Sequence, residues 1–313
     1  MSKTKGSRVD VGEAKKKKCD QKTVEDPEDV TILLIGKTGT GKSSVGNIIM
    51  NANHFEVGKN TLGCEKKRHP LPDGRRLAVI DTPGLFHTKL TAEEMKTQLT
   101  RCVSLCAPGP HVFLIVIEPK RFSREDKEMM KMIKRMFGDG AAKYTMALFS
   151  HGDEMERDGV SVERAVYFNP SFNDFLSKCK GGFHVFNNNK ENRNQVNELV
   201  GKIDNMVQRN GGRCYTNDMF REAQRAISRE ISQAGVNRET AERNNSFIRA
   251  VERAAAVAAA AEAAAEAAAE AAVAATAEAI AAAAAEAIVE AAVGVADVVS
   301  TVTAVREDGC VTQ

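Results

Sequence analysis

The sequence predicts an α/β fold, with a doubly wound, mostly parallel sheet, helices on both faces and a C-terminal helical extension. Two observations predict it. From residue 29 to about residue 210, apolar segments of strand length alternate with charged segments of helical period. A glycine-rich motif also directly follows the first apolar segment and precedes a helix-like one. The strand-like segments are 30–35, 77–80, 112–117, 145–149 and a shorter one at 183–186, and the helix-like segments include 44–50, 91–105, 123–137 and 191–209.

Composition divides the 313 residues into five parts. Residues 1–28 are polar, carry a lysine run at 15–18 and contain little to bury, which predicts a disordered basic arm. The lysine run also suits an anionic membrane or nucleic acid, but a net charge of +2 favours a solvated arm and no nucleic-acid partner. The other parts are an α/β domain over 29–212, an amphipathic helical extension over 213–253, an alanine-rich helical tail over 254–305 and a C-terminal tail over 306–313.

The glycine-rich motif has the form G-x-x-x-x-G-K-S. Between a strand and a helix, this motif holds phosphate, because backbone N–H groups and the helix N-terminus point at the anion. Lys42 is expected to neutralise the β- and γ-phosphates of a nucleotide, and the Ser43 hydroxyl is expected to bind Mg²⁺. The candidate phosphate-binding residues are Gly36, Lys37, Thr38, Gly39, Thr40, Gly41, Lys42 and Ser43.

A second motif, Asp81-Thr82-Pro83-Gly84, follows the strand-like segment 77–80. The Asp81 carboxylate is expected to reach the Mg²⁺ shell, and the Gly84 N–H is expected to meet a γ-phosphate. Thr61 lies between the two motifs, eighteen residues after Ser43 in a polar loop. It is a candidate for closing over Mg²⁺ and the γ-phosphate, and an ordinary loop threonine is the alternative.

A third set of polar residues follows the last two strand-like segments, where a nucleotide-binding sheet delivers its base-reading loops. The Asp153 carboxylate is expected to accept both N1–H and N2–H of guanine, a pattern that adenine lacks. Ser150 and His151 stand where Asn and Lys are usual, and His151 either stacks over the base or is solvated. The side-chain amides of Asn187 and Asn188 either bind the purine and orient the loop or form a plain turn.

The sequence resembles the immunity-associated (IMAP) GTPases of the septin and chloroplast-import-receptor superfamily. The resemblance covers roughly residues 29–235, about two-thirds of the chain. It implies a Ras-like domain, GTP or GDP with Mg²⁺ as ligands, and dimers with itself or related GTPases through the nucleotide-binding (G) face. It also implies a role in immune cells. The motifs that carry it are GKTGTGKSSVGN, DTPGLF, RCVSLCAPGPHVFLIVIEPKRFSREDK, SHGDEM, HVFNNN and NGGRCYTNDMF.

Matching these motifs residue by residue extends the phosphate loop to Ser44 and makes residues 29–212 a GTP-binding (G) domain. Two departures from the family stand out. The alanine-rich tail replaces the hydrophobic segment or coiled coil of several members, and Glu118-Pro119-Lys120 replaces a glycine-containing turn. By the same match, Thr61 is the first switch, Asp81–Gly84 is the second, Ser43, Thr61 and Asp81 hold the metal, and His151, Asp153, Asn187 and Asn188 lie on the base-binding loops.

Hydrolysis by a single copy is expected to be slow, because Leu85 stands where a small GTPase places a water-orienting glutamine. An arginine supplied across a dimer is expected to complete the site. Arg101 is the candidate because the matching family segment carries an arginine there, and a surface helix arginine is the alternative. The chain is then a dimerising switch or scaffold in immune-cell regulation, or a constitutively GTP-loaded structural module, as in septins. A metabolic kinase is disfavoured because no arginine-rich lid appears.

The alanine-rich tail holds seven acidic residues and no Lys or Arg. Carboxylates this frequent are costly in lipid, which predicts no transmembrane segment. Glutamates at multiples of four rotate around a helix of 3.6 residues per turn, so they define no coiled-coil seam and a solvated helical stalk is expected. The ending Cys310-Val311-Thr312-Gln313 fits C-a-a-X, so Cys310 is either a weak lipid anchor or part of a chance terminus.

The expected location is cytoplasmic, with peripheral membrane contact left open. The N-terminal residues lack the apolar core of a signal peptide. The seven cysteines are scattered, with no C-x-x-C pair, which favours a reducing compartment and free thiols.

Overall fold

The computed structural model describes residues 29–58, 63–84, 91–159, 161, 164, 169–187 and 193–308. These residues fall into two compact units. Residues up to 86 and 109–217 form a sheet-bearing unit, and residues 87–108 and 218 onward form a helical unit. Several predictions concern residues that lie outside the described part of the chain. They are the basic arm over 1–28 and the roles of Thr61, Leu85, Asn188 and Cys310.

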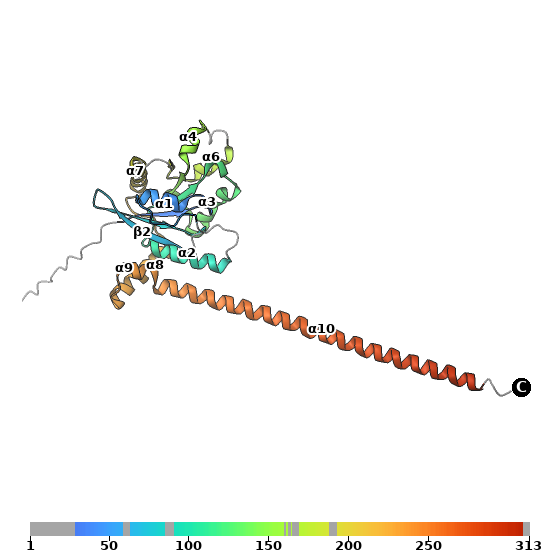
Figure 1. The fold of residues 1–313 in the computed structure, drawn as a ribbon. Helices are drawn as coiled ribbons and strands as arrows, with labels where there is room; N and C mark the ends of the chain where they lie inside the picture. The colour runs from blue at the N-terminus through green and yellow to red at the C-terminus, as the bar shows by residue number, and fades with distance from the viewer. Residues whose placement is uncertain are drawn as a thin grey trace, which may run out of the picture. The chain divides into compact units, whose positions relative to one another are not determined.

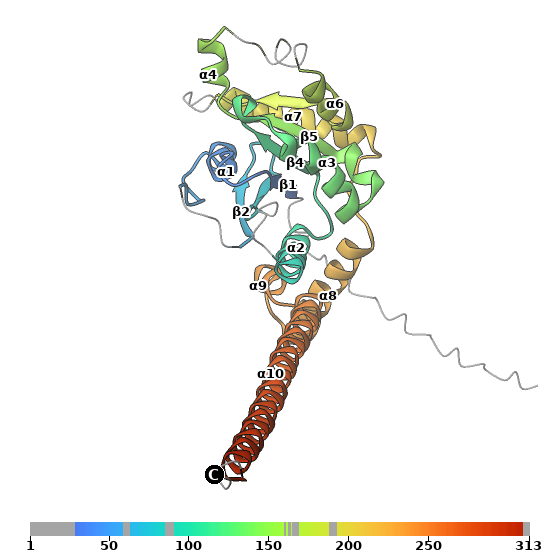
Figure 2. The ribbon, with the colours of Figure 1, turned by 90° about the vertical axis from the view of Figure 1, so that its right-hand side faces the viewer.

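The sheet-bearing unit contains a six-stranded, mostly parallel sheet, which confirms the predicted fold class (Figures 1 and 2). The strand order is β2-β3-β1-β4-β5-β6, and only the β2–β3 pair is antiparallel. Because the chain runs first to one side of β1 and then to the other, the carboxyl ends of the central strands form a switch point for ligands. The strands are β1 (Asp29–Ile35), β2 (Glu65–Pro70), β3 (Arg76–Asp81), β4 (Val112–Ile117), β5 (Thr145–Phe149) and β6 (Phe183–Val185).

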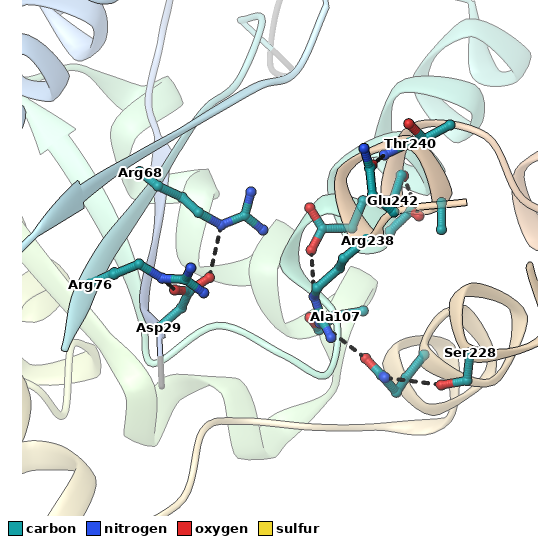
Figure 3. Close-up of polar contacts among 12 residues, drawn as sticks. Asp29, Arg68, Arg76, Ala107, Ser228, Arg238, Thr240 and Glu242 are labelled. Atoms are coloured by element: carbon teal, nitrogen blue, oxygen red, sulfur yellow. Dashed lines mark hydrogen bonds and ion pairs between the residues drawn. The ribbon is translucent and has the colours of Figure 1, made fainter. Parts of the chain in front are cut away.

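Strand β2 was not among the predicted strands, because its sequence Glu-Lys-Lys-Arg-His-Pro has no apolar run. Charged residues and proline are typical of edge strands, since they discourage pairing with another chain. Arg68 and Arg76 both donate through Nε to Asp29, at 2.9 and 2.8 Å, and so join β2, β3 and β1 (Figure 3). Burial raises the pKa of Asp29, but the two arginines outweigh it and hold that pKa below its usual value.

Helices cover both faces of the sheet. On one face, α1 (Lys42–Met50) and α7 (Arg193–Arg209) pack against alternate side chains of β1, β3, β4 and β5. On the other, the Phe137 ring of α3 (Arg124–Phe137) meets Phe113, with centroids 4.8 Å apart. There too, Phe172 of α6 (Pro170–Lys178) meets Phe149 at 5.2 Å. The other elements among the described residues of this unit are α4 (Gly152–Arg157) and the 3₁₀ turns η1 (Pro119–Arg121) and η2 (Asp139–Tyr144).

The helical unit consists of α2 (Ala92–Cys106), α8 (Asp218–Ala234), α9 (Arg238–Arg243) and α10 (Ser246–Asp308). Buried polar contacts join α2 to the later helices. Ser104 Oγ donates to the carbonyl oxygen of Glu242 at 2.7 Å and accepts from Asn245 Nδ2 at 2.7 Å. Arg238 donates to Glu242 Oε1 and to the carbonyl oxygen of Ala107, both at 2.9 Å (Figure 3). The helix predicted over 91–105 is therefore part of the helical unit.

Helix α10 runs through the alanine-rich segment without a break, as Figure 1 shows, so the predicted helix there is confirmed. The side chains of residues 256–284 are exposed. By length and composition alone, the stretch Arg238–Ala284 is apolar enough to cross a membrane, with mean hydropathy 1.4 in its most apolar window, none of which is buried. The absence of a transmembrane segment therefore stays a prediction.

The cysteines agree only in part with the expectation of free thiols. Cys106, Cys179 and Cys214 are reduced, and burial raises the pKa of the Cys179 thiol to about 12. Cys64 and Cys102, by contrast, are disulfide-bonded, so the prediction of free thiols is wrong at these two positions. Spacing along the chain alone does not decide whether a given cysteine is a free thiol.

Candidate functional site

The predicted phosphate loop connects β1 to α1 at the carboxyl edge of the sheet. Gly39 and Gly41 have φ values of 83° and 85°, in the left-handed region that glycine adopts without strain. A Cβ atom at Gly36 would lie 2.7 Å from the carbonyl oxygen of Val116, so no side chain fits there. Ser44 is half-buried in the first turn of α1. The glycines therefore permit a tight loop whose backbone N–H groups precede a helix N-terminus, as anion binding requires.

Lys42 folds back over this loop. Its Nζ donates to the carbonyl oxygens of Gly36 at 3.1 Å and Lys37 at 2.9 Å. Only 6% of the residue is exposed. Burial lowers the pKa of the ammonium, while the nearby Asp81 carboxylate opposes that effect. A buried cation held by carbonyl oxygens inside a glycine-rich loop is suited to an incoming anion, because phosphate oxygens carry the charge that carbonyl oxygens lack.

The two predicted metal residues of the described region, Ser43 and Asp81, lie in direct contact. Ser43 Oγ donates to Asp81 Oδ2 at 2.6 Å. Asp81 is only 1% exposed, and its Oδ1 atom has no hydrogen-bond partner among the described residues. Burial raises the pKa of Asp81, while the Ser43 hydrogen bond and the Lys42 charge act in the opposite direction. A buried carboxylate oxygen without a partner is costly unless a cation or a donor satisfies it.

This pair fits Mg²⁺ in a site that a nucleotide completes. Within the described residues, no three His, Cys, Asp or Glu side chains gather around one point. Mg²⁺ usually takes one or two carboxylates and fills its remaining positions with substrate phosphates and water. One carboxylate and one hydroxyl beside a phosphate loop match that donor set.

The Asp81–Gly84 segment lies against the phosphate loop. Thr82 Oγ1 donates to the carbonyl oxygen of Leu34 at 2.8 Å, which fixes the segment after β3 to β1. A Cβ atom at Gly84 would lie 2.2 Å from Thr38 Oγ1. Any side chain at residue 84 would therefore displace Thr38, and the structure brings these two motifs together. The role of the Gly84 N–H toward a γ-phosphate stays a prediction.

The candidate base-reading loop after β5 is tied to the phosphate loop. Ser150 Oγ donates to the carbonyl oxygen of Thr40 at 3.2 Å, and His151 Nδ1 lies 3.0 Å from Ser150 Oγ. His151 caps α4 with φ of 60°, a conformation that places Asp153 in the first turn of that helix. The Asp153 side chain is 14% exposed, and Arg157 Nη2 lies 3.7 Å from its Oδ2 atom.

Asn187, after β6, is held by two residues that the sequence did not single out. Its Nδ2 donates to Glu156 Oε2 at 3.3 Å. Its backbone N–H donates to Gln195 Oε1 at 3.1 Å, and Gln195 Nε2 donates to its carbonyl oxygen at 3.3 Å. The Oδ1 atom of Asn187 is buried without a partner in the described structure. Gln195 gave no sequence signal, because a lone glutamine in a charged helix looks like a surface residue.

The start of the loop that carries Thr61 is hydrogen-bonded to Asn47, another residue that the sequence did not single out. Asn47, on α1, accepts through Oδ1 from the N–H groups of His54 and Phe55 at 2.9 and 2.8 Å. Its Nδ2 donates to the carbonyl oxygen of Phe55 at 2.9 Å. The proximal end of the loop is therefore fixed to the helix that begins with Lys42.

Arg101, the predicted trans-acting arginine, lies on α2 and pairs within the helical unit. Its Nη2 is 2.8 Å from Glu252 Oε1, and the two side chains are 48% and 38% exposed. An exposed ion pair of this kind is typical of a surface helix arginine, which was the alternative. Its catalytic role stays a prediction.

Comparisons with known proteins show what this chain is similar to. A family model described as the AIG1 family matches residues 30–234. The chain is 31% identical over 204 residues to immune-associated nucleotide-binding protein 9 of Arabidopsis thaliana, which covers 62% of this chain and 60% of that protein. It is 30% identical over 197 residues to GTPase IMAP family member 8 of Homo sapiens, covering 60% and 29%.

Among solved structures, the chain is similar to Toc33 from Arabidopsis thaliana in complex with GDP and Mg²⁺, with a TM-score of 0.47 and 19% identity. The match covers 58% of this chain and 85% of that one. The chain thus spans about 60% of the length of the first curated relative and a smaller part of the human one.

Proposed function

This chain belongs to the AIG1 family, and on that premise we propose that it binds GTP and GDP with Mg²⁺ as a nucleotide-dependent dimerising switch or scaffold with slow intrinsic hydrolysis. One observation carries the proposal. The Ser43 hydroxyl meets the buried Asp81 carboxylate at 2.6 Å, beside the buried ammonium of Lys42 and a glycine-rich loop. A phosphate-binding loop joined to a divalent-cation site is what a nucleoside triphosphate with Mg²⁺ requires.

Each group has a defined task in this proposal. Lys42 would donate to phosphate oxygens in place of its two carbonyl partners, and Ser43 and Asp81 would hold Mg²⁺, whose charge would neutralise that of the phosphates. Asp153 accepts from guanine N1–H and N2–H, while His151 and Asn187 line the same loops.

Replacing Ser43 with alanine is expected to lower GDP affinity about tenfold in Mg²⁺ and to leave it within about twofold in EDTA, because the hydroxyl acts only through the cation. Equilibrium titration with a fluorescent GDP analogue measures both. Ser177→Ala, at an exposed position of α6 outside the phosphate loop, is the control. If Ser43→Ala lowered GDP affinity equally in Mg²⁺ and in EDTA, the metal role of Ser43 would be contradicted.

The effect of Mg²⁺ on affinity is also expected to shrink as pH falls. Burial raises the pKa of Asp81, so its protonation begins to compete with Mg²⁺ at a higher pH than for an ordinary aspartate.

GTP hydrolysis per site is expected to rise with protein concentration, because Leu85 cannot orient water and a second copy must complete the site. A single-turnover assay at low and high concentration measures this. Arg101→Ala is expected to remove the concentration-dependent part. Glu252→Gln, which loosens the same ion pair but keeps the arginine, is expected to retain it. A rate independent of concentration would instead favour a constitutively GTP-loaded structural module.

The proposal extends to the cellular role and location of the chain. The relatives named above are called immune-associated or IMAP proteins, which supports a role in immune-cell regulation. We propose a cytoplasmic location, with peripheral contact with a membrane as the alternative. Fractionation of cells expressing the full chain, in low and high salt, tests that location.

A further inference from the structure

The side chain of Lys37 is fully engaged with the start of helix α3. Its Nζ donates to Asp126 Oδ2 at 2.6 Å, to Ser123 Oγ at 3.0 Å and to the carbonyl oxygen of Arg121 at 3.2 Å. A lysine ammonium has three N–H donors, so three acceptors use all of them. Although Lys37 belongs to the phosphate loop, its side chain has no donor left for a phosphate.

Asp126 makes this contact hard to break. The residue is 1% exposed, and its Oδ2 also accepts from the N–H of Ser123 at 2.8 Å. Its Oδ1 atom has no partner in the described part of the chain. Removing the cation from a buried carboxylate strongly destabilises the folded protein, because the remaining charge is neither solvated nor paired. The helix that carries Asp126 is itself fixed, since its Met129 and Ile133 side chains are fully buried.

The main chain of Lys37 serves the other lysine of the loop. The carbonyl oxygen of Lys37 accepts from Lys42 Nζ at 2.9 Å and from Thr40 Oγ1 at 2.9 Å. A shift of Lys37 would therefore carry with it the acceptor that holds Lys42. Helix α3, 89 residues away in sequence at Asp126, is thus connected through one side chain to the lysine of the phosphate site.

We propose that Asp126 and Lys37 are positioning residues: their ion pair holds the phosphate loop in the shape that receives a nucleoside diphosphate or triphosphate. Lys42 then supplies the only lysine charge of the loop to the phosphates. This inference rests on the proposed function, since it concerns how the same site binds its ligand. It assigns to Asp126 and Ser123 a part in nucleotide binding, although the motif that contains them gave neither residue a role in the site.

The experiment measures release of a fluorescent GDP analogue from the full chain in Mg²⁺. Asp126→Asn and Lys37→Met are each expected to speed release of the GDP analogue about tenfold. Contacting residues are coupled by free energies that correspond to a change of about tenfold in a binding constant. Glu125→Gln is the matched control. It removes the same charge one residue away, from a side chain that is 63% exposed and 4.0 Å from Lys37 Nζ. Its release rate is expected to stay within about twofold of the wild type.

A double variant separates positioning from simple stabilisation. Lys37→Met with Asp126→Asn leaves no buried charge unpaired, so its melting temperature is expected to recover relative to Lys37→Met alone. Release of the GDP analogue is expected to stay fast, because the loop remains untethered. The ³¹P NMR shifts of bound GDP at saturation are expected to differ from the wild type in the double variant and to match it in Glu125→Gln.

The outcomes are distinct. Slow, wild-type release from the double variant, with unchanged ³¹P shifts, would overturn the positioning role alone. A wild-type chain that binds no GDP analogue would overturn the proposed function and, with it, this inference. Fast release with shifted phosphorus signals in a stable double variant supports both.

Discussion

Replacing Lys42 with methionine is expected to lower the affinity for GTP about a hundredfold or more. Hydrogen bonds to charged groups contribute more than neutral ones, and the Lys42 ammonium, which donates to two carbonyl oxygens, is expected to donate to phosphate oxygens instead. Methionine keeps the buried stem but removes the ammonium, so the loss reflects charge rather than packing. Isothermal titration with GTP and with GDP in Mg²⁺ measures it.

Lys120→Met is the control for the Lys42 variant. Lys120 is 48% exposed and pairs with Glu154 and Asp158 on the surface. Its loss is expected to leave GTP affinity nearly unaltered, because exposed ion pairs contribute little. A Lys42→Met chain that is folded by melting analysis and binds GTP as tightly as the wild type would refute the phosphate site.

Replacing Asp153 with asparagine is expected to shift the preference of the site from guanine to xanthine nucleotides, by about a hundredfold in the ratio of affinities. The Asp153 carboxylate is expected to accept two N–H groups of guanine. An asparagine amide offers one acceptor and one donor, and the donor suits the second carbonyl group of xanthine. Competition between GTP, XTP and ATP for a fluorescent analogue measures the change.

The neighbouring carboxylate provides the control for Asp153. Glu154→Gln removes the same charge from the same turn of α4, but Glu154 contacts Lys120 and not the base-reading position. Its discrimination between GTP and XTP is expected to match the wild type. Unaltered GTP affinity in Asp153→Asn would show that this loop does not read the base.

The sequence predicted those parts of the molecule that are contiguous along the chain. The strand β1, the phosphate loop and the start of α1 form one stretch whose periodicity and glycines are visible together. The second motif was equally readable, because Asp81 ends a buried strand. Parallel strands place such ends on one edge, so the meeting of Ser43 and Asp81 follows from the predicted topology.

The supports of the site were not predictable, because each joins distant segments. Asp126 meets Lys37 across 89 residues, and in sequence it is one acid in a charged helix. The Gln195 side chain is hydrogen-bonded to both the N–H and the carbonyl oxygen of Asn187, and this is possible only because α7 begins beside the end of β6. Strand β2 was not predicted either. Its charged residues suit an edge strand, and they leave no alternation of apolar and polar residues in the sequence.

The length and exposure of α10 imply that the chain unfolds in two separate ways. With 63 residues, the helix is about 95 Å long, and most of its described alanine side chains are exposed. Its helicity therefore comes from the intrinsic preference of alanine rather than from tertiary packing. On heating, α10 is expected to lose its turns gradually, whereas the sheet with its buried core is expected to melt in one cooperative step.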